Sequence, residues 1–567
     1  FFTENLGMFD NFGAQGANSY WTFNWSNPPL FYTRRIGRSP QGGPPDAADF
    51  SDLPVATHIL GAAKLTGTLT PGLDVGLVQA VTRREDAEYS ASGVRAKTMV
   101  EPQTYYGVAR VFRQFRGGFN GLGNMTTLTQ RQLDGGVLED DLNRQALVSG
   151  VDGWHCVDRS KLWVLTGWAA ASRVTGTRER MIALQRSSRH YYQRPDVDYL
   201  GVDSSATSLT GHAARVWLVK TRGNVVSNSA IGYVTPGFDV NDLGFLSRTD
   251  EINAHVGGGY KWTTPNRWRR YVSLVGALFQ TRDFSGAIIW EGVWANHEAT
   301  YANNWTSSVS AAWNPSCMLD TRARGGPRLR YPGNREIQLD VCTDSKKRIC
   351  YELNANANGS PGVGTYGVAA NPAVEWKPLS NLSVAVGPGY DHTVEDAQYV
   401  TQVDAPGEVP AGFGDRRYVF ARLDQTTISA NIRINVSFTP NLSLQTYLQP
   451  LFCAGHYTEF KELARAGAYE FAHYGAAYDP VTGMVTPPGG GTPFALDDPS
   501  FNYRSLRGNA VLRWEYRPGS ALYVVWTQTR SDDEAHGDLE FGHSVRRLFD
   551  AHADDIFLVK ATYGFDL

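Results

Sequence analysis

The sequence predicts an all-β protein: a large closed antiparallel transmembrane β-barrel of about 22 strands, in a range of roughly 20 to 26, with long loops on one side. Residues 432–448 carry this prediction, because apolar and polar side chains alternate before and after the turn Thr439-Pro440-Asn441. Such a hairpin has one apolar and one polar face. In a soluble sandwich the polar face meets water outside, whereas in a membrane barrel lipid contacts the apolar face and water fills the inside.

Composition favours the membrane barrel. The 567 residues include 58 Gly, 27 Tyr, 26 Phe and 15 Trp, and 19% are charged. Aromatic residues suit the interfacial girdles of a barrel, although an aromatic-rich secreted β protein is an alternative. No run of about 18 apolar residues is present, so a transmembrane helix is not available. Only a closed barrel could then span a bilayer with every backbone group paired.

The first segment, residues 1–27, is rich in Gly, Asn and aromatic residues and lacks a long alternating run. We expect it to fold into the barrel lumen as a plug or to lie beneath a barrel formed by residues 28–567. A chain that starts at Phe1 without Met is typical of a mature or trimmed protein.

Alternation then predicts the strands of the barrel in order. They are 30–38, 57–69, 73–83, 103–116, 119–132, 147–158, 161–173, 207–221, 225–235 and 248–263, six shorter strands between Trp268 and Trp376, and 381–395, 416–438, 442–453, 501–516, 520–531 and 555–567. The last strand alternates up to the final residue, which suits a closing strand. A soluble edge strand of this kind would invite aggregation.

Turns and loops are predicted to lie on opposite sides of the sheet. Even numbers of predicted strands separate the Pro- and Gly-marked turns, so these turns share one side: 70–72, 264–266, 377–381, 439–441 and 517–519. The long loops are 174–206, 454–500 and 532–554, and a Gly- and Arg-rich excursion spans 317–333. Outer-membrane barrels have short periplasmic turns and long extracellular loops. We therefore expect the outer membrane of a Gram-negative bacterium, with the long loops extracellular.

Six motifs resemble a bacterial outer-membrane β-barrel family of unknown function. They are FFTENLGMFDNFG (1–13), LFYTRRIGR (30–38), LQRSSRHYYQRPD (184–196), TPGFDVNDLGFLSRTD (235–250), RGGP (324–327) and RWEYRPGSALYVVWTQ (513–528). Members of this family usually carry the β region after a module similar to family 9 carbohydrate-binding domains. The resemblance implies no established activity or catalytic residue. No such module precedes this sequence, whether cleaved, outside the numbering or lacking, which weakens a sugar-related function.

Eight arginines are candidate ligand-binding residues of a polar lumen or of the loops: Arg34, Arg35, Arg38, Arg324, Arg328, Arg330, Arg433 and Arg513. Guanidinium groups would bind carboxylated, phosphorylated or lipopolysaccharide-like ligands. The alternative is structural, with inward arginines paired to inward acids such as Glu515.

Metal and thiol chemistry is limited. Asp239, Asn241 and Asp242 offer oxygen ligands suited to Ca²⁺, or they cap the loop backbone; no other cofactor is expected. Cys342 and Cys350 flank a polar hairpin turn, so a disulfide between them is predicted, which would imply an oxidising compartment.

No enzyme is predicted, because the histidines are scattered and neither GxSxG nor HExxH occurs. A barrel hydrolase, whose catalytic residues meet only in space, is the weakest alternative. The leading hypothesis is a plugged or gated conduit for a polar solute, one that could be related to carbohydrate. The other is a non-enzymatic surface scaffold or receptor whose loops bind a partner protein or glycan. Expected partners are outer-membrane lipid and lipopolysaccharide and a surface or periplasmic protein or glycan, whereas a net charge of -3 argues against nucleic acid.

Overall fold

A computed structural model of the chain describes residues 7–10, 12–13, 15–16, 21, 24–25, 27–133 and 135–564. Parts of the expected plug and the end of the last expected strand, residues 565–567, lie outside the described residues. The chain forms two compact units. Unit 1 comprises Phe1–Tyr260, Ala277–Glu291 and Met318–Pro327, and unit 2 comprises Lys261–Gly276, Gly292–Cys317 and Arg328–Leu567.

The protein is all-β, as predicted, and the main element of its described residues is an antiparallel sheet of 22 strands. The strands are β2 (Ile59–Thr70), β3 (Leu73–Thr82), β6 (Thr104–Phe115), β7 (Asn120–Arg131), β8 (Gln145–Cys156), β9 (Trp163–Thr175), β10 (Ser208–Lys220), β11 (Val225–Val234), β12 (Glu251–Trp262), β13 (Arg269–Arg282), β14 (Ile288–Tyr301), β15 (Thr306–Asn314), β18 (Asn334–Cys342), β19 (Ile349–Ser360), β20 (Thr365–Leu379), β21 (Leu382–Asp404), β22 (Arg416–Thr439), β23 (Leu442–Leu463), β24 (Phe471–His473), β28 (Phe501–Arg517), β29 (Ser520–Glu534) and β30 (Asp554–Thr562).

The remaining elements lie in the connections. They are β1 (Phe50–Asp52), β4 (Glu85–Ala91), β5 (Val94–Glu101), β16 (Cys317–Leu319), β17 (Leu329–Tyr331), β25 (Tyr478–Asp479), β26 (Met484–Val485), β27 (Phe494–Ala495), the helices α1 (Gly7–Asp10), α2 (Arg178–Arg186) and α3 (Phe541–Asp550), and the 3-10 turns η1 (Thr33–Arg35), η2 (Arg116–Gly118) and η3 (Gly475–Ala477). Within the described residues, no helix has both the length and the apolar character needed to cross a membrane.

The hairpin at 432–448 forms with the predicted apolar and polar faces. β22 pairs with β23 so that Val436 lies opposite Leu444 and Ile432 opposite Leu448. Because side chains alternate between faces along a strand, these apolar residues share one face, and Arg433 and Asn435 lie on the other. The two-residue period of the sequence therefore decided the pairing here.

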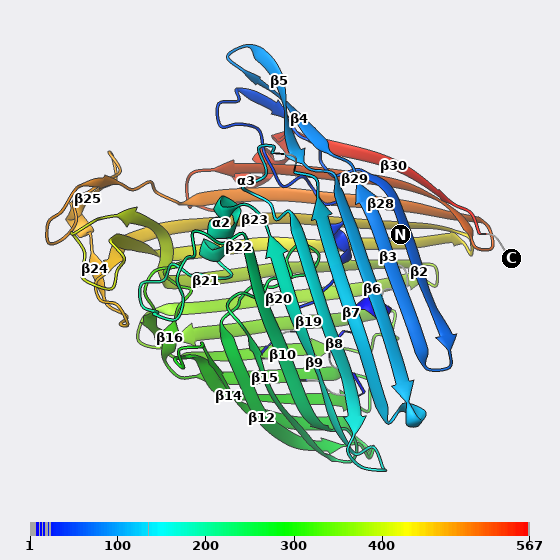
Figure 1. The fold of residues 1–567 in the computed structure, drawn as a ribbon. Coiled ribbons are helices and arrows are strands. Elements are labelled where there is room, and N and C mark those ends of the chain that lie inside the picture. The colour runs from blue at the N-terminus through cyan, green and yellow to red at the C-terminus, as the bar shows by residue number, and fades with distance from the viewer. Residues whose placement is uncertain are drawn as a thin grey trace. The chain divides into compact units, whose positions relative to one another are not determined.

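Short turns and long connections alternate within each unit. In unit 1 the short turns are 71–72, 116–119, 157–162 and 221–224, and the connections at the opposite strand ends are 83–103, 132–144, 176–207 and 235–250. In unit 2 the turns 380–381, 440–441 and 518–519 contrast with 405–415, 464–500 and 535–553. Figure 1 shows two of the long connections as extensions, β4 and β5 beyond the ends of β3 and β6, and β24 and β25 beyond the ends of β21–β23.

Two expectations were wrong. Residues 30–38 form no strand; they contain η1, and Leu30, Phe31 and Ile36 are buried in the core of unit 1. The segment was assigned to the sheet because its alternation resembles a strand, but its apolar side chains cover the sheet instead. The β4–β5 hairpin was missed, because it follows β3 directly and pairs with β1 in a separate three-stranded sheet.

Candidate functional site

The N-terminal segment lies against one face of the sheet in unit 1, which we call the covered face: the face of β3 and β6–β12 whose side chains are buried. Phe9, Trp25 and Phe31 join the same hydrophobic core as Val78, Trp168 and other residues of these strands. The segment therefore replaces water over this part of the sheet, which is how a lumen plug would act.

Asp152 on β8 is the polar anchor of this segment. Its carboxylate accepts two hydrogen bonds from the Arg110 guanidinium, at 2.5 and 2.8 Å, and one from the Gly13 backbone N–H at 3.1 Å. Gln15 Nε2 donates to the same carboxylate at 3.2 Å. Arg110 and Asp152 are almost fully buried, so the pair satisfies both charges away from water.

The Arg110–Asp152 pair needs Gly123. Arg110 lies on β6 and Asp152 on β8, and Gly123 on β7 lies between them. A Cβ at Gly123 would approach Arg110 Nη1 and Asp152 Oδ1 to 2.8 Å. The absence of a side chain at this position therefore lets the ion pair reach across an intervening strand.

A second buried arginine, Arg215 on β10, is held mainly by aromatic rings. Its guanidinium carbon lies 4.6 Å from the Trp25 ring centroid and 4.9 Å from that of Trp217. Arg215 also donates to Asn253 Oδ1 at 3.1 Å. Since Trp25 belongs to the N-terminal segment, this cation–π contact again fixes the segment to the covered face.

The 235–250 connection also packs on the covered face. Arg131 at the end of β7 pairs with Asp242, and Asn143 Nδ2 donates to the other oxygen of that carboxylate at 2.8 Å. The His190 ring lies 3.2 Å from the buried Asp239 carboxylate. Burial raises the pKa of Asp239, but His190, the Arg189 charge and the Asn241 backbone N–H together outweigh it, so that pKa lies below its usual value.

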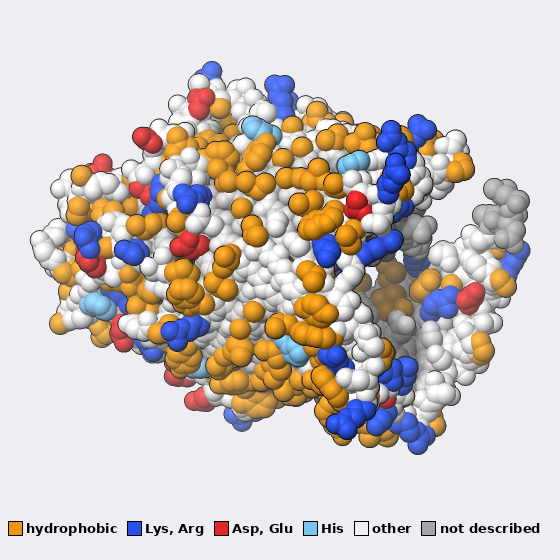
Figure 2. Space-filling model, turned by 90° about the horizontal axis from the view of Figure 1, so that it is seen from below, with side chains coloured by type: hydrophobic (Ala, Val, Ile, Leu, Met, Phe, Trp, Pro, Cys, Tyr) orange, Lys and Arg blue, Asp and Glu red, His pale blue; other side chains and the backbone are white. Residues whose placement is uncertain are grey.

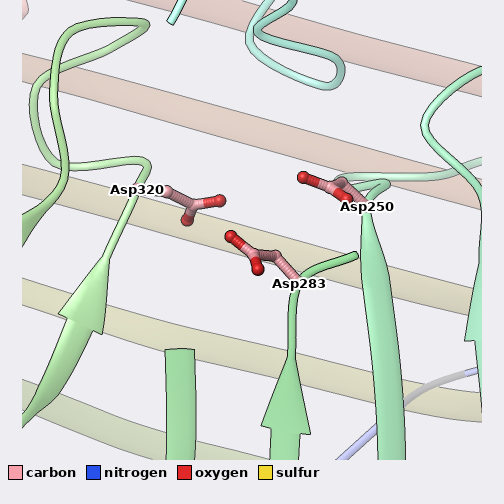
Figure 3. Close-up of side chains that lie close together, drawn as sticks. All are labelled: Asp250, Asp283 and Asp320. Carbon is pink, nitrogen blue, oxygen red and sulfur yellow. The ribbon is translucent and has the colours of Figure 1, made fainter. Parts of the chain in front are cut away.

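Arg194 joins three carboxylates from three separate connections, and we call this arrangement the Arg194 cluster. Figure 3 shows the three carboxylates, of Asp250, Asp283 and Asp320, lying close together. The Arg194 guanidinium pairs with Asp320 and lies 3.5 Å from Asp250 and 3.8 Å from Asp283. Oxygens of Asp250, Asp283 and Asp320 lie within 4.8 Å of one another, and all three residues are buried. Arg248 adds two hydrogen bonds to Asp320, at 2.7 and 2.8 Å.

The Arg194 cluster has the oxygen donors that Ca²⁺ prefers. A guanidinium, however, already contacts all three carboxylates and supplies positive charge. Burial raises the pKa of Asp250, and burial together with the hydrogen bond to Asp250 raises the pKa of Tyr199, whose hydroxyl donates at 2.6 Å. The chemistry of the cluster is therefore that of a buried ionic clasp between connections.

The first three predicted arginines lie beside the covered face. Arg34 is exposed, and Arg35 Nε donates to the Gly244 carbonyl at 3.1 Å. Arg38 is half-buried, and burial and the nearby Arg131 lower the pKa of its guanidinium.

The other five predicted arginines are dispersed. Arg324 and Arg330 are exposed and Arg328 is half-buried. Arg433 lies 5.1 Å from the Tyr447 ring centroid, and Arg513 pairs with Glu515 at 2.5 Å. The alternative that inward arginines pair with acids thus describes Arg513, and it also describes Arg110, Arg131 and Arg194, which were not among the candidates.

The predicted disulfide is not formed: Cys342 and Cys350 are free thiols. The β18–β19 register places Cys342 opposite Glu352, two residues beyond Cys350. The two cysteines flank the turn symmetrically in the sequence, but the strand register does not place them opposite each other.

The predicted Ca²⁺ ligands engage protein donors. Asp239 Oδ1 accepts from the Asn241 backbone N–H at 2.8 Å, and Asn241 Oδ1 accepts from Leu246 N at 2.9 Å, which is the backbone-capping alternative. Ca²⁺ binding there stays a prediction. The Arg194 cluster was missed because its members come from positions 194, 250, 283 and 320, and no spacing in the sequence connects them.

Comparisons with known proteins give a family and a distant likeness. No curated protein matches the sequence significantly. The crystal structure of the outer membrane transporter YddB from Escherichia coli is similar with 7% sequence identity and a TM-score of 0.37 over 83% of this chain; the match spans 62% of the transporter chain, a likeness too low to carry an argument. The model of the family described as Domain of unknown function (DUF5916) matches residues 23–567, and the protein belongs to that family.

Proposed function

We propose that the sheet closes into an outer-membrane β-barrel that forms a plugged conduit for a polar solute. The observation that carries the proposal is the division of neighbouring strands in unit 2 into one polar and one apolar face. A barrel in lipid requires this division, with the polar face towards an aqueous lumen.

The polar face is continuous across five strands, β14, β15, β18, β19 and β20. Hydrogen-bonded register places three rows of residues side by side on it. These rows are Asn296-Ser310-Gln338-Asn356-Ala369, Glu298-Ser308-Asp340-Asn354-Asn371 and Thr300-Thr306-Cys342-Glu352-Ala373. Amide, hydroxyl and carboxylate groups dominate, so water and polar solutes would be accommodated along this wall.

The opposite face of the same strands is apolar. The intervening rows are Ala295-Ala311-Ile337-Ala357-Val368 and His297-Val309-Leu339-Ala355-Ala370. Ile337, Val368 and Trp376 are exposed. Figure 2 shows hydrophobic side chains spread over much of the face that it draws. Apolar surface of this extent would be unfavourable in water and is satisfied by lipid tails.

The N-terminal segment supplies the plug in this proposal. It covers the face of unit 1 through Asp152, Arg215 and the hydrophobic core. A cavity of about 470 Å³ remains beside it, lined by Gln15, Thr66, Asp74 and Arg110 among others. Polar groups next to an incompletely filled space suit a plug that water can enter.

The charge of the polar face favours neutral or cationic solutes. Its three rows contain Glu298, Asp340 and Glu352 and neither Lys nor Arg. Carboxylate rings favour cations in channels, whereas arginine or lysine rings favour anions. In this proposal these acids, and not the predicted arginines, determine which solutes the conduit prefers.

The test is the conductance of the purified full chain in planar lipid bilayers, compared with a variant that lacks residues 1–27. The deletion is expected to raise conductance, and the reversal potential in a KCl gradient is expected to show preference for K⁺. Neutralising the three acids (Glu298→Gln, Asp340→Asn, Glu352→Gln) should reduce that preference. The matched control is Glu88→Gln on the exposed β4. Absence of conductance in every variant would contradict the conduit.

A surface receptor is the second candidate, because the 464–500 connection has a core of its own. Tyr474, Val485 and Leu496 pack with Val419 and Phe460, and β25–β27 form a small sheet. A folded connection can present a stable binding surface to a protein or glycan. Replacing residues 478–495 by a short Gly-Ser linker should abolish capture of a stoichiometric partner and leave conductance unchanged.

A further inference from the structure

Helix α3, in the connection between β29 and β30, packs on the sheet of unit 2 through one apolar side. Leu548 is buried with Phe452 and Leu506, and Val545 packs against them. The Phe541 ring lies 5.2 Å from the Phe452 ring. The helix therefore covers β23 and β28 at this level.

The sheet face under α3 is the apolar one. Along β23, Leu444, Leu448 and Phe452 are separated by four residues and share a face. Leu444 lies opposite Leu512, and Phe452 opposite Arg504. In a barrel this is the lipid side, so α3 lies outside the wall.

The height of α3 follows from the strand geometry. Trp514, exposed near the 518–519 turn, lies ten residues after Arg504 on the same face of β28. Ten residues span about 33 Å of strand. With a tilt of about 40° this is about 25 Å of height, close to the height of the apolar band of a membrane barrel. Arg504 and Phe452 thus lie at the border where lipid tails give way to headgroups.

Charged residues at this border hold the helix in place. Arg504 is fully buried and pairs with Asp532 at 3.0 Å and Glu534 at 2.6 Å. Arg547 of α3 donates to the Asp532 carboxylate at 2.8 and 2.9 Å. These ion pairs fix one side of α3 and shield the buried Arg504.

The outward side of α3 is amphipathic. Phe541 and Phe549 remain 52% and 60% exposed although Val545 between them packs on the sheet. Residues 541, 545 and 549 lie on one flank of a helix with 3.6 residues per turn. Arg546 and Asp550 are exposed on the other flank.

We propose that α3 is an interfacial helix that binds the anionic headgroup layer of the outer leaflet. Phe541 and Phe549 enter the border of the acyl chains, and Arg546 meets the lipid phosphates. Amphipathic helices with aromatic residues on one side and charged residues on the other bind this region of a membrane. The inference rests on the proposed barrel, because it requires the apolar face to contact lipid.

The test uses the full chain with its native cysteines replaced by serine, reconstituted into vesicles of phosphatidylcholine and phosphatidylglycerol. Phe549→Cys carries an environment-sensitive NBD label, and Asp550→Cys, the next residue on the polar flank, is the matched control. Compared with NBD at position 550, NBD at position 549 is expected to emit at shorter wavelength. It is also expected to be quenched several-fold more by lipids that carry a nitroxide in the headgroup region. Vesicles without phosphatidylglycerol should reduce the quenching, and Arg546→Gln should remove this dependence.

The outcomes separate the inference from the proposed function. Equal, water-like emission at positions 549 and 550 in flotation-purified vesicles would overturn the helix assignment and leave the barrel intact. Equal quenching at both positions would also overturn it, because the flanks would then be equivalent. Failure of the wild-type chain to float with vesicles would instead contradict the barrel itself. Hydrogen exchange of the unsubstituted α3, expected to slow in the same vesicles relative to detergent, checks the result without a label.

Discussion

Asp152→Asn is the most direct test of how the covered face is held. The substitution keeps the size of the side chain but removes the charge that faces the Arg110 guanidinium. The new amide NH₂ group is a donor, so it cannot accept a hydrogen bond from the guanidinium. Both residues are almost fully buried, so an uncompensated arginine would remain. Breaking a buried ion pair in this way costs about 3–5 kcal/mol. Weakened bonds from Gly13 and Gln15 would add about 1 kcal/mol.

The assay is the free energy of unfolding from denaturant titration in detergent micelles, followed by tryptophan fluorescence. The double variant Arg110→Met, Asp152→Leu is the control, because replacing both charges with apolar groups of similar volume is often close to neutral. We expect the double variant to be more stable than Asp152→Asn alone. A single-variant cost below about 1 kcal/mol, or a double variant as unstable as the single one, would refute the reasoning.

Three further predictions concern the connections and the thiols. Arg194→Gln should leave the three carboxylates of the Arg194 cluster without their shared cation, so trypsin should cleave the 176–207 connection faster than in the wild type at pH 7. The difference in cleavage rate should be smaller near pH 4, because carboxylates begin to take up protons there. Asp250→Asn should stabilise the protein at pH 8. Burial raises the folded pKa of Asp250, so wild-type stability falls as pH rises through that pKa. The stability gained by the substitution should therefore vanish below about pH 4. Asparagine also tolerates the positive φ of 62° at this position. A gain independent of pH would contradict this assignment. Cys342 and Cys350 should both react with maleimide after unfolding without reductant, which mass spectrometry measures. A peptide mass without the label on both cysteines would contradict the free thiols.

The strands were predictable where each one pairs with the strands next to it in the sequence. β22 and the strands from β6 to β12 match their expected spans within a few residues, because alternation records which face each side chain occupies. β23 runs ten residues past its expected end at 453, to Leu463. The final strand ends at Thr562 in the structure, against the expected 555–567, whose last three residues lie outside the described part of the chain. The segment 30–38 failed because a chain that packs on a sheet can be as apolar as one that belongs to it.

The candidate site was predicted less well. Charge alone indicated that arginines pair with inward acids, but the buried partners are Arg110, Arg131 and Arg194, none of which stood out by spacing. The functional side chains are joined by cross-strand register and by loop packing, and neither can be read from local sequence.

Local sequence was enough to predict the all-β class, the two-faced strands, and the contrast between short turns and long connections, because each depends on local period and turn chemistry. Three-dimensional packing alone revealed that Gly123 makes room for Arg110 and Asp152, that Arg194 joins three carboxylates, and that Arg547 of α3 shares Asp532 with Arg504. These contacts join residues from different strands and connections. Their energy depends on burial, which exists only once the chain has folded.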